Sequence, residues 1–268
     1  MANKRRMNLF LMATTSALRL QIERSLEGRF PAALTPVQRA VCEVAATGIA
    51  SVDDLLEGGL PIGAISEITG ANSSGRTSIA LSFIAQRTQD GQVCAWVDVS
   101  DTLDPESAAA CGVGLPRLLW VRCKDATNAK GKPWSRLDQA IRATDLLLQA
   151  AGFGAIVLDL GNTAAEYGRR IPLATWFRYR QAAQRSRTSL VVVGRRSYAQ
   201  SSAEVVLECK AHPGAAGRTV LKGLVFEVHR QRKRFQYAAV PATGKKPPVS
   251  TWSISSQWTD AAAGIARP

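Results

Sequence analysis

The sequence predicts an α/β fold in which a mostly parallel β-sheet is covered by helices on both faces. Two observations carry this prediction. Short, almost continuously apolar runs alternate with segments of helical periodicity, a pattern typical of strands buried on both faces. The chain has 268 residues with 46% hydrophobic side chains, which is enough to bury the core of one such domain. We also expect a helical N-terminal arm before the sheet and a β-rich edge at its C-terminal end.

The N-terminal segment, residues 1–48, is predicted to be the helical arm. Leu18, Ile22 and Leu26 follow one another at i, i+4 and i+8, so they form an apolar stripe on one face of a helix that ends at Gly28. A second short helix is expected over Pro36–Ala46. The stripe is the candidate docking surface for a protein partner, and packing against the chain's own core is the alternative.

Residues 49–241 are predicted to form the α/β core, and residues 242–268 a polar tail. The expected strands of the parallel sheet are Ala64–Thr69, Val93–Val97, Leu118–Arg122, Ala155–Leu160 and Ser189–Val193. The expected helices are Ser51–Leu56, Thr77–Gln89, Pro105–Ala110, Pro133–Ala151 and Pro172–Arg185. The β-rich edge is expected from Val205–Cys209, Thr219–Val228 and Phe235–Val240.

The charge of the chain indicates a polyanionic partner. Lys and Arg number 34 against 21 Asp and Glu, a formal net charge of +13. The excess is concentrated in residues 1–39 and 111–268, whereas residues 40–110 are acidic. This distribution favours nucleic acid over an anionic membrane. No apolar run approaches the length of a membrane-spanning helix, so we expect no membrane association.

The cysteines favour a cytoplasmic protein. They are five in number, widely scattered and never in a C-x-x-C pair, which is typical of reduced thiols. The basic Lys4–Arg6 followed by the apolar Met7–Met12 imitates a secretory signal. We interpret it as a basic leader because the cysteines point to the cytosol.

A glycine-rich loop between a predicted strand and a predicted helix is the main chemical motif. Its candidate nucleotide-binding residues are Gly70, Asn72, Ser73, Ser74, Gly75, Arg76, Thr77 and Ser78. The spacing is that of the P-loop G-x-x-x-x-G-K-[ST], with Arg76 where the lysine belongs. Such a loop wraps backbone N–H groups around a phosphate. Thr77 and Asp159, the latter at the end of an apolar strand, would be the Mg²⁺ ligands. The alternative is a strand–helix turn that binds no ligand.

The motifs around this loop resemble those of RecA recombinases. The resemblance runs through Ser51–Gly70 and Val97–Pro105 and covers roughly residues 50–230 in order. It implies that Thr77, Asp104 and Asp159 keep the family's nucleotide-site residues. Four positions depart from the family. Its P-loop lysine, water-activating glutamate, adenine-stacking tyrosine and Asn-Gln sensor are replaced by Arg76, Ser100, Ser107 and Gly194–Arg195.

These replacements predict a P-loop protein without ATPase activity. An unassisted Ser100 hydroxyl has too little proton affinity to act as a general base. Arg76 keeps the positive charge but is longer and planar, so it replaces a point-charge lysine poorly. We therefore expect no catalytic residue and no required cofactor, with ATP or ADP and Mg²⁺ as the ligands if the site is retained.

A RecA-like chain with these losses resembles the ImuA accessory factors of bacterial translesion synthesis, which are related to the division inhibitor SulA. The resemblance implies a role in the SOS response. It also implies three protein partners, which are a RecA-type recombinase, an ImuB-like Y-family polymerase homologue and an error-prone polymerase. The basic charge of the chain adds DNA, bound without sequence preference. The alternatives are an active DNA-dependent ATPase of the recombinase or RadA type, and a SulA-like division inhibitor.

An arginine-rich stretch is the candidate DNA-binding surface. No acidic residue occurs between Glu166 and Glu204, and aromatic residues are interleaved with the arginines. Phosphate neutralisation and base stacking call for these two residue types. The candidates are Arg169, Arg170, Arg178, Arg180, Arg185, Arg187, Arg195 and Arg196. The alternative is a solvated helix whose Trp176, Phe177 and Tyr179 pack partly into the core. The basic run His229–Arg234 extends the same surface or protects an edge strand.

Overall fold

A computed structural model describes residues 42–127, 133–161, 163, 170–212, 223–234 and 249–255. Leu18, Ile22 and Leu26 of the predicted arm lie outside these ranges, as do Arg169 and the predicted strand at residues 235–240. Among the described residues, no helix is both long and apolar enough to cross a membrane.

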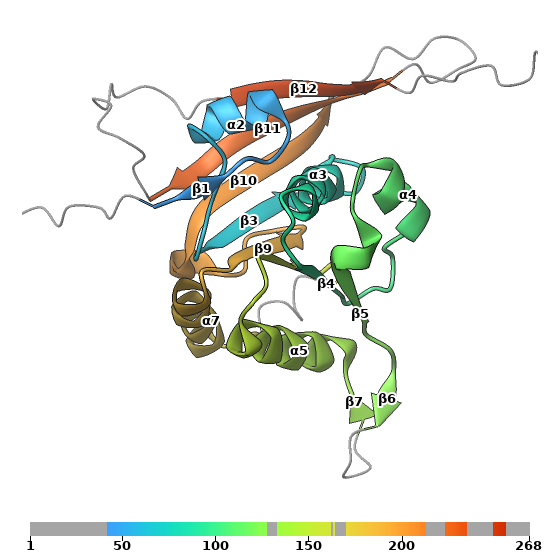
Figure 1. The fold of residues 1–268 in the computed structure, drawn as a ribbon, viewed down its shortest axis with the longest axis vertical. Helices are drawn as coiled ribbons and strands as arrows, with labels where there is room; N and C mark the ends of the chain where they lie inside the picture. The colour runs from blue at the N-terminus through green and yellow to red at the C-terminus, as the bar shows by residue number, and fades with distance from the viewer. Residues whose placement is uncertain are drawn as a thin grey trace, which may run out of the picture. The chain divides into compact units, whose positions relative to one another are not determined.

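An eight-stranded sheet forms the centre of the fold, in the order β12-β11-β10-β3-β9-β8-β4-β5 (Figure 1). The strands from β10 to β5 run parallel, whereas β11 and β12 add an antiparallel edge. Their bounds are β3 Ile65–Gly70, β4 Cys94–Asp98, β5 Leu118–Arg122, β8 Ala155–Asp159, β9 Ser189–Gly194, β10 Ala203–His212, β11 Gly223–Lys233 and β12 Val249–Ser255. The predicted mostly parallel sheet with a β-rich C-terminal edge is therefore confirmed.

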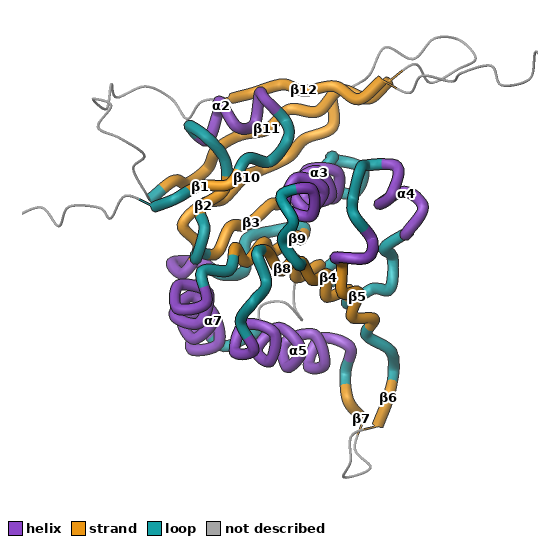
Figure 2. The backbone as a smooth tube through the Cα atoms, in the orientation of Figure 1, coloured by secondary structure: helices purple, strands orange, loops and turns teal. Residues whose placement is uncertain are grey.

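Helices cover both faces of this sheet (Figure 2). The helices are α2 Ala50–Leu56, α3 Arg76–Gln89, α4 Pro105–Ala110, α5 Arg136–Ala150 and α7 Leu173–Ser186. Successive strand residues alternate between two cores. Val157 lies in the core that includes residues of α2, α3 and α4, whereas Ile156 and Leu158 lie in the core that includes residues of α5 and α7. Burial on both faces explains why the central strands β4, β8 and β9 are almost continuously apolar.

Short elements complete the fold and correct two predicted helices. They are β1 Val44–Ala45 paired with β2 Leu60–Pro61, β6 Ala126–Thr127 paired with β7 Pro133–Trp134, and the 3-10 turns η1 Leu115–Arg117 and η2 Gln200–Ser202. The prediction of a helix over Pro36–Ala46 is wrong for residues 42–46, which the structure describes, because β1 lies there. The helix expected from Pro133 begins three residues later, at Arg136, because Ser135 caps it by accepting the Asp138 N–H at 3.1 Å.

The C-terminal strands extend further than the apolar pattern predicts. Strand β11 continues through the basic run up to Lys233, and β12 lies within residues 242–268, which were expected to be a polar tail. Strand β12 pairs with β11 from Val249 to Ser255. Its residues, Val-Ser-Thr-Trp-Ser-Ile-Ser, mix apolar and polar side chains, and it lies beyond a polar segment, so the sequence pattern does not separate it from the expected tail.

Candidate functional site

The glycine-rich loop connects the end of β3 to the start of α3, as the P-loop pattern predicts. Ser73 and Gly75 have positive φ angles of 59° and 85°, so the loop curls back on itself. Phe226 of β11 supports the loop, since a Cβ at Gly75 would lie 2.8 Å from its ring. A side chain at position 75 would therefore be excluded by both the backbone and the packing.

Arg76 turns back into the protein from the first turn of α3. Its Nη1 donates to the carbonyl oxygen of Gly70 at 2.5 Å, and its Nη2 donates to that of Gly161 at 3.2 Å. The guanidinium thus links the start of the loop to the residues that follow β8. Only 7% of Arg76 is exposed, and burial lowers its pKa, which nearby Arg195 lowers further while Asp159 opposes the shift.

A pocket of about 500 Å³ lies over the loop and brings most of the predicted nucleotide-site residues together. Its lining includes the loop residues Asn72, Ser73, Ser74, Gly75, Arg76, Thr77 and Ser78, together with Thr102, Asp159, Gly161 and Phe226. Thr77 and Asp159, the predicted Mg²⁺ ligands, therefore share one pocket. Among the described residues, no three His, Cys, Asp or Glu side chains come together as a metal site.

Asp104 is not part of the described lining of this pocket, and its side chain caps helix α4. It caps α4 by accepting hydrogen bonds from the Ser107 N–H at 3.0 Å and the Ser107 hydroxyl at 2.5 Å. The Ser107 hydroxyl bond is the main reason that the pKa of Asp104 is lowered. Ser107, at the position of the family's adenine-stacking tyrosine, is therefore hydrogen-bonded to Asp104.

Two buried carboxylates end the neighbouring strands β4 and β8, where Asp98 and Asp159 are register partners. Burial raises the pKa of Asp159 to about 6, and the charge of Asp98 adds to the rise. The Gly161 N–H, which donates to Asp159 Oδ1 at 2.8 Å, and the charge of Arg76 oppose it. The fold therefore penalises the ionised form of Asp159 that Mg²⁺ would need.

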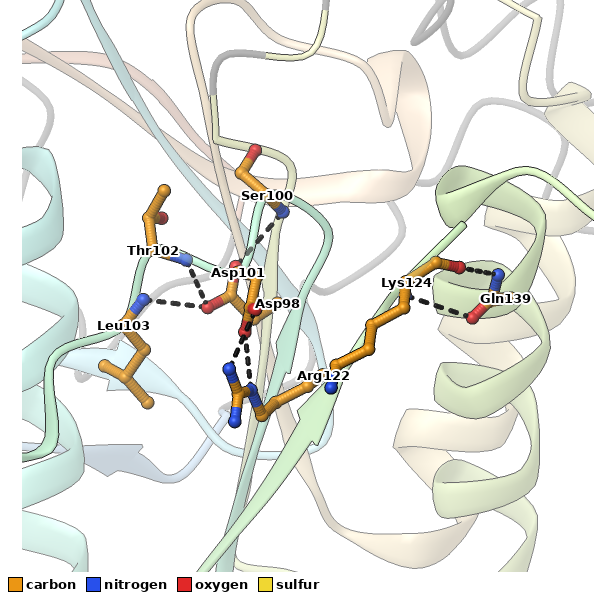
Figure 3. A network of polar contacts seen from close by, with 8 residues as sticks. All are labelled: Asp98, Ser100, Asp101, Thr102, Leu103, Arg122, Lys124 and Gln139. Carbon is orange, nitrogen blue, oxygen red and sulfur yellow. Dashed lines mark hydrogen bonds and ion pairs between the residues drawn. The ribbon is translucent and has the colours of Figure 1, made fainter. Parts of the chain in front are cut away.

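Asp98 fixes the loop that carries Ser100 (Figure 3). It accepts backbone N–H groups from Ser100 at 3.1 Å and from Thr102 and Leu103 at 2.8 Å each. Ser100 packs closely against Gly161, because a Cβ at Gly161 would lie 2.4 Å from Ser100 Oγ. Sequence reasoning missed Asp98, although its place at the end of a predicted apolar strand could have revealed it.

The predicted arginine surface is divided in the structure. Distant acids pair with two arginines of α7 and with Arg187 directly after it. Arg178 pairs with Asp145 at 3.0 Å, Arg180 with Glu204 at 2.9 Å, and Arg187 with Glu43. Arg170 and Arg185 are exposed. The interleaved Trp176 and Tyr179 are fully buried in the core, whereas Phe177 is 57% exposed. This part of the stretch thus has the properties of the solvated helix that was the alternative prediction.

Arg195 and Arg196 lie apart from these, in the loop after β9, where they line a second pocket of about 900 Å³. Lys210 of β10 and Arg232 of β11 line it as well, and Glu208 is the only acidic residue in the described part of the lining. Sequence reasoning placed Arg232 in a basic run and did not single out Lys210. Strand pairing brings both to the pocket that Arg195 and Arg196 line.

Comparison with known proteins agrees with this geometry. The model of the RecA N-terminal domain family matches residues 15–164, more than half of the chain. Protein RecA of Nostoc sp. is 35% identical over 139 residues, which cover 52% of this chain and 36% of that protein. Protein RecA of Allorhizobium ampelinum is 39% identical over 118 residues, which cover 44% of this chain and 30% of that protein. The chain thus matches about a third of the length of these relatives.

A solved structure extends the likeness beyond the family match. The crystal structure of the RadB recombinase aligns with 77% of this chain and 94% of its own, at a TM-score of 0.55 and 17% sequence identity. Identity at that level shows the fold. Together with the family match and the P-loop at the end of β3, it shows that the chain belongs to the RecA family.

Proposed function

We propose that the protein is a non-catalytic RecA-like accessory factor in DNA damage tolerance, which binds DNA and protein partners without hydrolysing ATP. The observation that carries the proposal is the position of Arg76. Its guanidinium donates to two backbone carbonyl oxygens, those of Gly70 and Gly161, at the place where the family has its P-loop lysine.

The Arg76 contacts oppose nucleotide binding. To reach a phosphate, the guanidinium would have to give up hydrogen bonds made by a charged donor, each of which contributes about 1.5–3 kcal/mol. The connection between the P-loop and the residues after β8 would be lost at the same time, because the Arg76 guanidinium makes it. A nucleotide would thus compete with the protein's own carbonyl groups.

No other described carboxylate near the pocket is suited to replace the missing general base. Asp98 is fully buried and its oxygens already accept three backbone N–H groups. Asp159 occupies the position of the predicted metal ligand and accepts the Gly161 N–H. Ser100, at the family's glutamate position, offers only a hydroxyl. The states of Asp98, Asp159 and Ser100 support a site that cannot activate water.

The proposed binding partners are inferred from the net charge of the chain and from its membership of the RecA family. The net charge of +13 favours DNA bound through its phosphates without sequence preference. Membership of the RecA family supports a role beside a RecA-type recombinase. An ImuB-like polymerase homologue and an error-prone polymerase complete the proposed set, on the strength of the sequence resemblance to ImuA.

Steady-state phosphate release with and without single-stranded DNA tests the proposal, with RecA measured in parallel as the active control. The wild-type protein should release no phosphate above the buffer. Arg76→Lys should also be inactive, because the general base is still missing. DNA-stimulated release by the wild type would instead make the protein a recombinase-type ATPase. Failure to bind DNA in a mobility-shift assay would favour a SulA-like inhibitor.

A further inference from the structure

We propose that strand β12 is the edge at which two copies of this chain pair antiparallel, so that their sheets join into one. Strand β12 is the outermost strand on its side of the sheet, because it pairs with β11 and no described strand pairs with its other side (Figure 1). Alternate backbone N–H and C=O groups of an edge strand point away from its neighbour, where a further strand can pair. The proposal goes beyond the proposed function and does not depend on it.

Strand β12 lacks the features that usually protect an exposed edge. Protected edge strands are very short, or they carry a charged side chain, a proline or a bulge. Strand β12 covers seven residues, Val249–Ser255, with no charged residue and no proline. All seven pair with β11 in continuous register, whereas the register of β10 shifts against both of its neighbours. A neutral, regular strand of this length is a template for pairing with another chain.

The composition of β12 supports the same conclusion. Four of its residues, Val249, Thr251, Trp252 and Ile254, belong to the types that are enriched in strands. The strand at the opposite edge of the sheet, β5, has five residues and ends in the charged Arg122. The two edges therefore differ, and only β12 combines a neutral sequence with an unbroken register.

The basic residues of β11 lie beyond this edge and are bound to helix α2. Pairing between β11 and β12 ends at His229. Arg230 then donates to the carbonyl oxygen of Leu55 at 2.8 Å and to Glu57 Oε1 at 3.2 Å, and Lys233 Nζ lies 2.7 Å from Glu57 Oε2. Helix α2 packs against both β11 and β12. These contacts fix the two strands to the core and leave the paired length of β12 neutral.

A second copy of the chain is the occupant that fits this edge. Each copy has a net charge of +13, so two copies repel each other wherever basic surfaces meet, and a neutral strand is a place where they can approach. Identical strands that pair antiparallel about a two-fold axis form a contact that closes after two copies. An axis at Trp252, the middle residue, keeps all seven residues paired and places Thr251 opposite Ser253 of the second copy.

The chain's own residues 256–268 are the alternative occupant. They contain four alanines, one glycine and one proline, which are residue types depleted in strands. Their sequence therefore suits the edge less well than a second copy of β12 does.

Sedimentation velocity of the full chain, over a range of protein and salt concentrations, tests the proposal. The wild type should reach the mass of two chains and grow no further, because the contact is closed. Added salt should strengthen the dimer, since it screens the repulsion between two copies that each carry +13. An assembly held by pairs of opposite charges would weaken instead.

The edge variant is Thr251→Lys with Ser253→Lys. The register partners of these two positions on β11, Glu227 and Val225, are partly exposed, so lysines here are compatible with the fold. In the dimer each new lysine would lie opposite a lysine of the second copy. Like charges directly opposite destabilise a pair of strands, so the dimer Kd should rise on the order of tenfold at low salt.

The matched control is Gln181→Lys with Gln184→Lys, which adds the same charge to exposed positions of α7. Its dimer Kd should equal that of the wild type. If thermal melting shows that the edge variant does not fold, Ser253→Lys alone should give a smaller rise in Kd, because its two lysines lie diagonally across the axis.

Hydrogen exchange followed by mass spectrometry locates the contact. The amides of Val249–Ser255 should exchange more slowly as the concentration of the wild type rises, and those of Leu118–Arg122 in β5 should not change. In the edge variant, exchange in β12 should no longer depend on concentration.

Three results would overturn the proposal. One is a wild type that stays monomeric at every concentration; if deletion of residues 256–268 then produced a dimer, the edge would belong to the chain's own tail. The second is a dimer whose Kd is unchanged in the folded edge variant, and the third is β12 exchange that does not depend on concentration. Both would place the contact elsewhere. None of these results bears on DNA binding or phosphate release, so the proposed function is tested separately.

Discussion

Replacing Arg76 with lysine should destabilise the protein, although it restores the family's residue. Lysine can reach one of the two carbonyl groups, so the hydrogen bond to Gly70 or to Gly161 is lost. A hydrogen bond from a charged donor contributes about 1.5–3 kcal/mol. For a domain of this size, that loss corresponds to a fall in Tm of about 3–12 °C.

Thermal melting of Arg76→Lys beside Arg117→Lys measures the effect. Arg117 also donates to a backbone carbonyl, that of Gly91 at 2.8 Å, but it does so in solvent. Its replacement should therefore change the stability by no more than about 0.5 kcal/mol. Because a lysine at position 76 would leave the carbonyl groups more readily, ATP with Mg²⁺ should raise the Tm of Arg76→Lys more than that of the wild type. Equal melting of the two lysine variants would refute a stabilising role for Arg76.

Three further predictions concern other parts of the chain. Burial raises the pKa of Asp159 from 3.8 to about 6, so its contribution to stability is present below about pH 4 and lost as the pH rises through 6. Asp159→Asn should thus be more stable than the wild type at pH 7, by up to about 3 kcal/mol, and equal to it near pH 4, as thermal melts across this range would show. Gly75→Ala should cost about 1–3 kcal/mol more than Gly91→Ala in denaturant unfolding. Both glycines have a φ near +80°, but only the first would push a methyl group into Phe226. Deleting residues 1–30 should abolish capture by RecA without lowering the Tm, whereas a collapsed Tm would mean that the arm belongs to the chain's own core.

The sequence predicts the sheet and the P-loop well because both follow from local patterns. Apolar runs locate β3, β4, β5, β8 and β9 to within a residue, and the runs are clearest for β4, β8 and β9, which are fully buried and tolerate few polar residues. Glycine spacing locates the loop between β3 and α3. Strand β12 escapes prediction although Val249, Trp252 and Ile254 are apolar, because it lies beyond a polar segment and only its pairing with β11 identifies it.

The functional surfaces are harder to predict because they depend on contacts between distant segments. A stretch without acidic residues looks unpaired in the sequence, yet Asp145, Glu204 and Glu43 pair with three of its arginines. In the same way, strand pairing and not sequence proximity brings Lys210 and Arg232 to Arg195. The replacement at Arg76 was visible in the sequence, but its two carbonyl partners, one of them 85 residues away, were not.

The most direct test of the account is a single-turnover experiment in which protein in excess is mixed with labelled ATP, Mg²⁺ and single-stranded DNA. With protein in excess, slow product release cannot hide a chemical step. The account predicts no labelled phosphate above the protein-free control, because Ser100 supplies no base and Arg76 stays on the Gly70 and Gly161 carbonyl groups. Stoichiometric conversion of the bound ATP, lost in an Asp159→Asn variant, would contradict it.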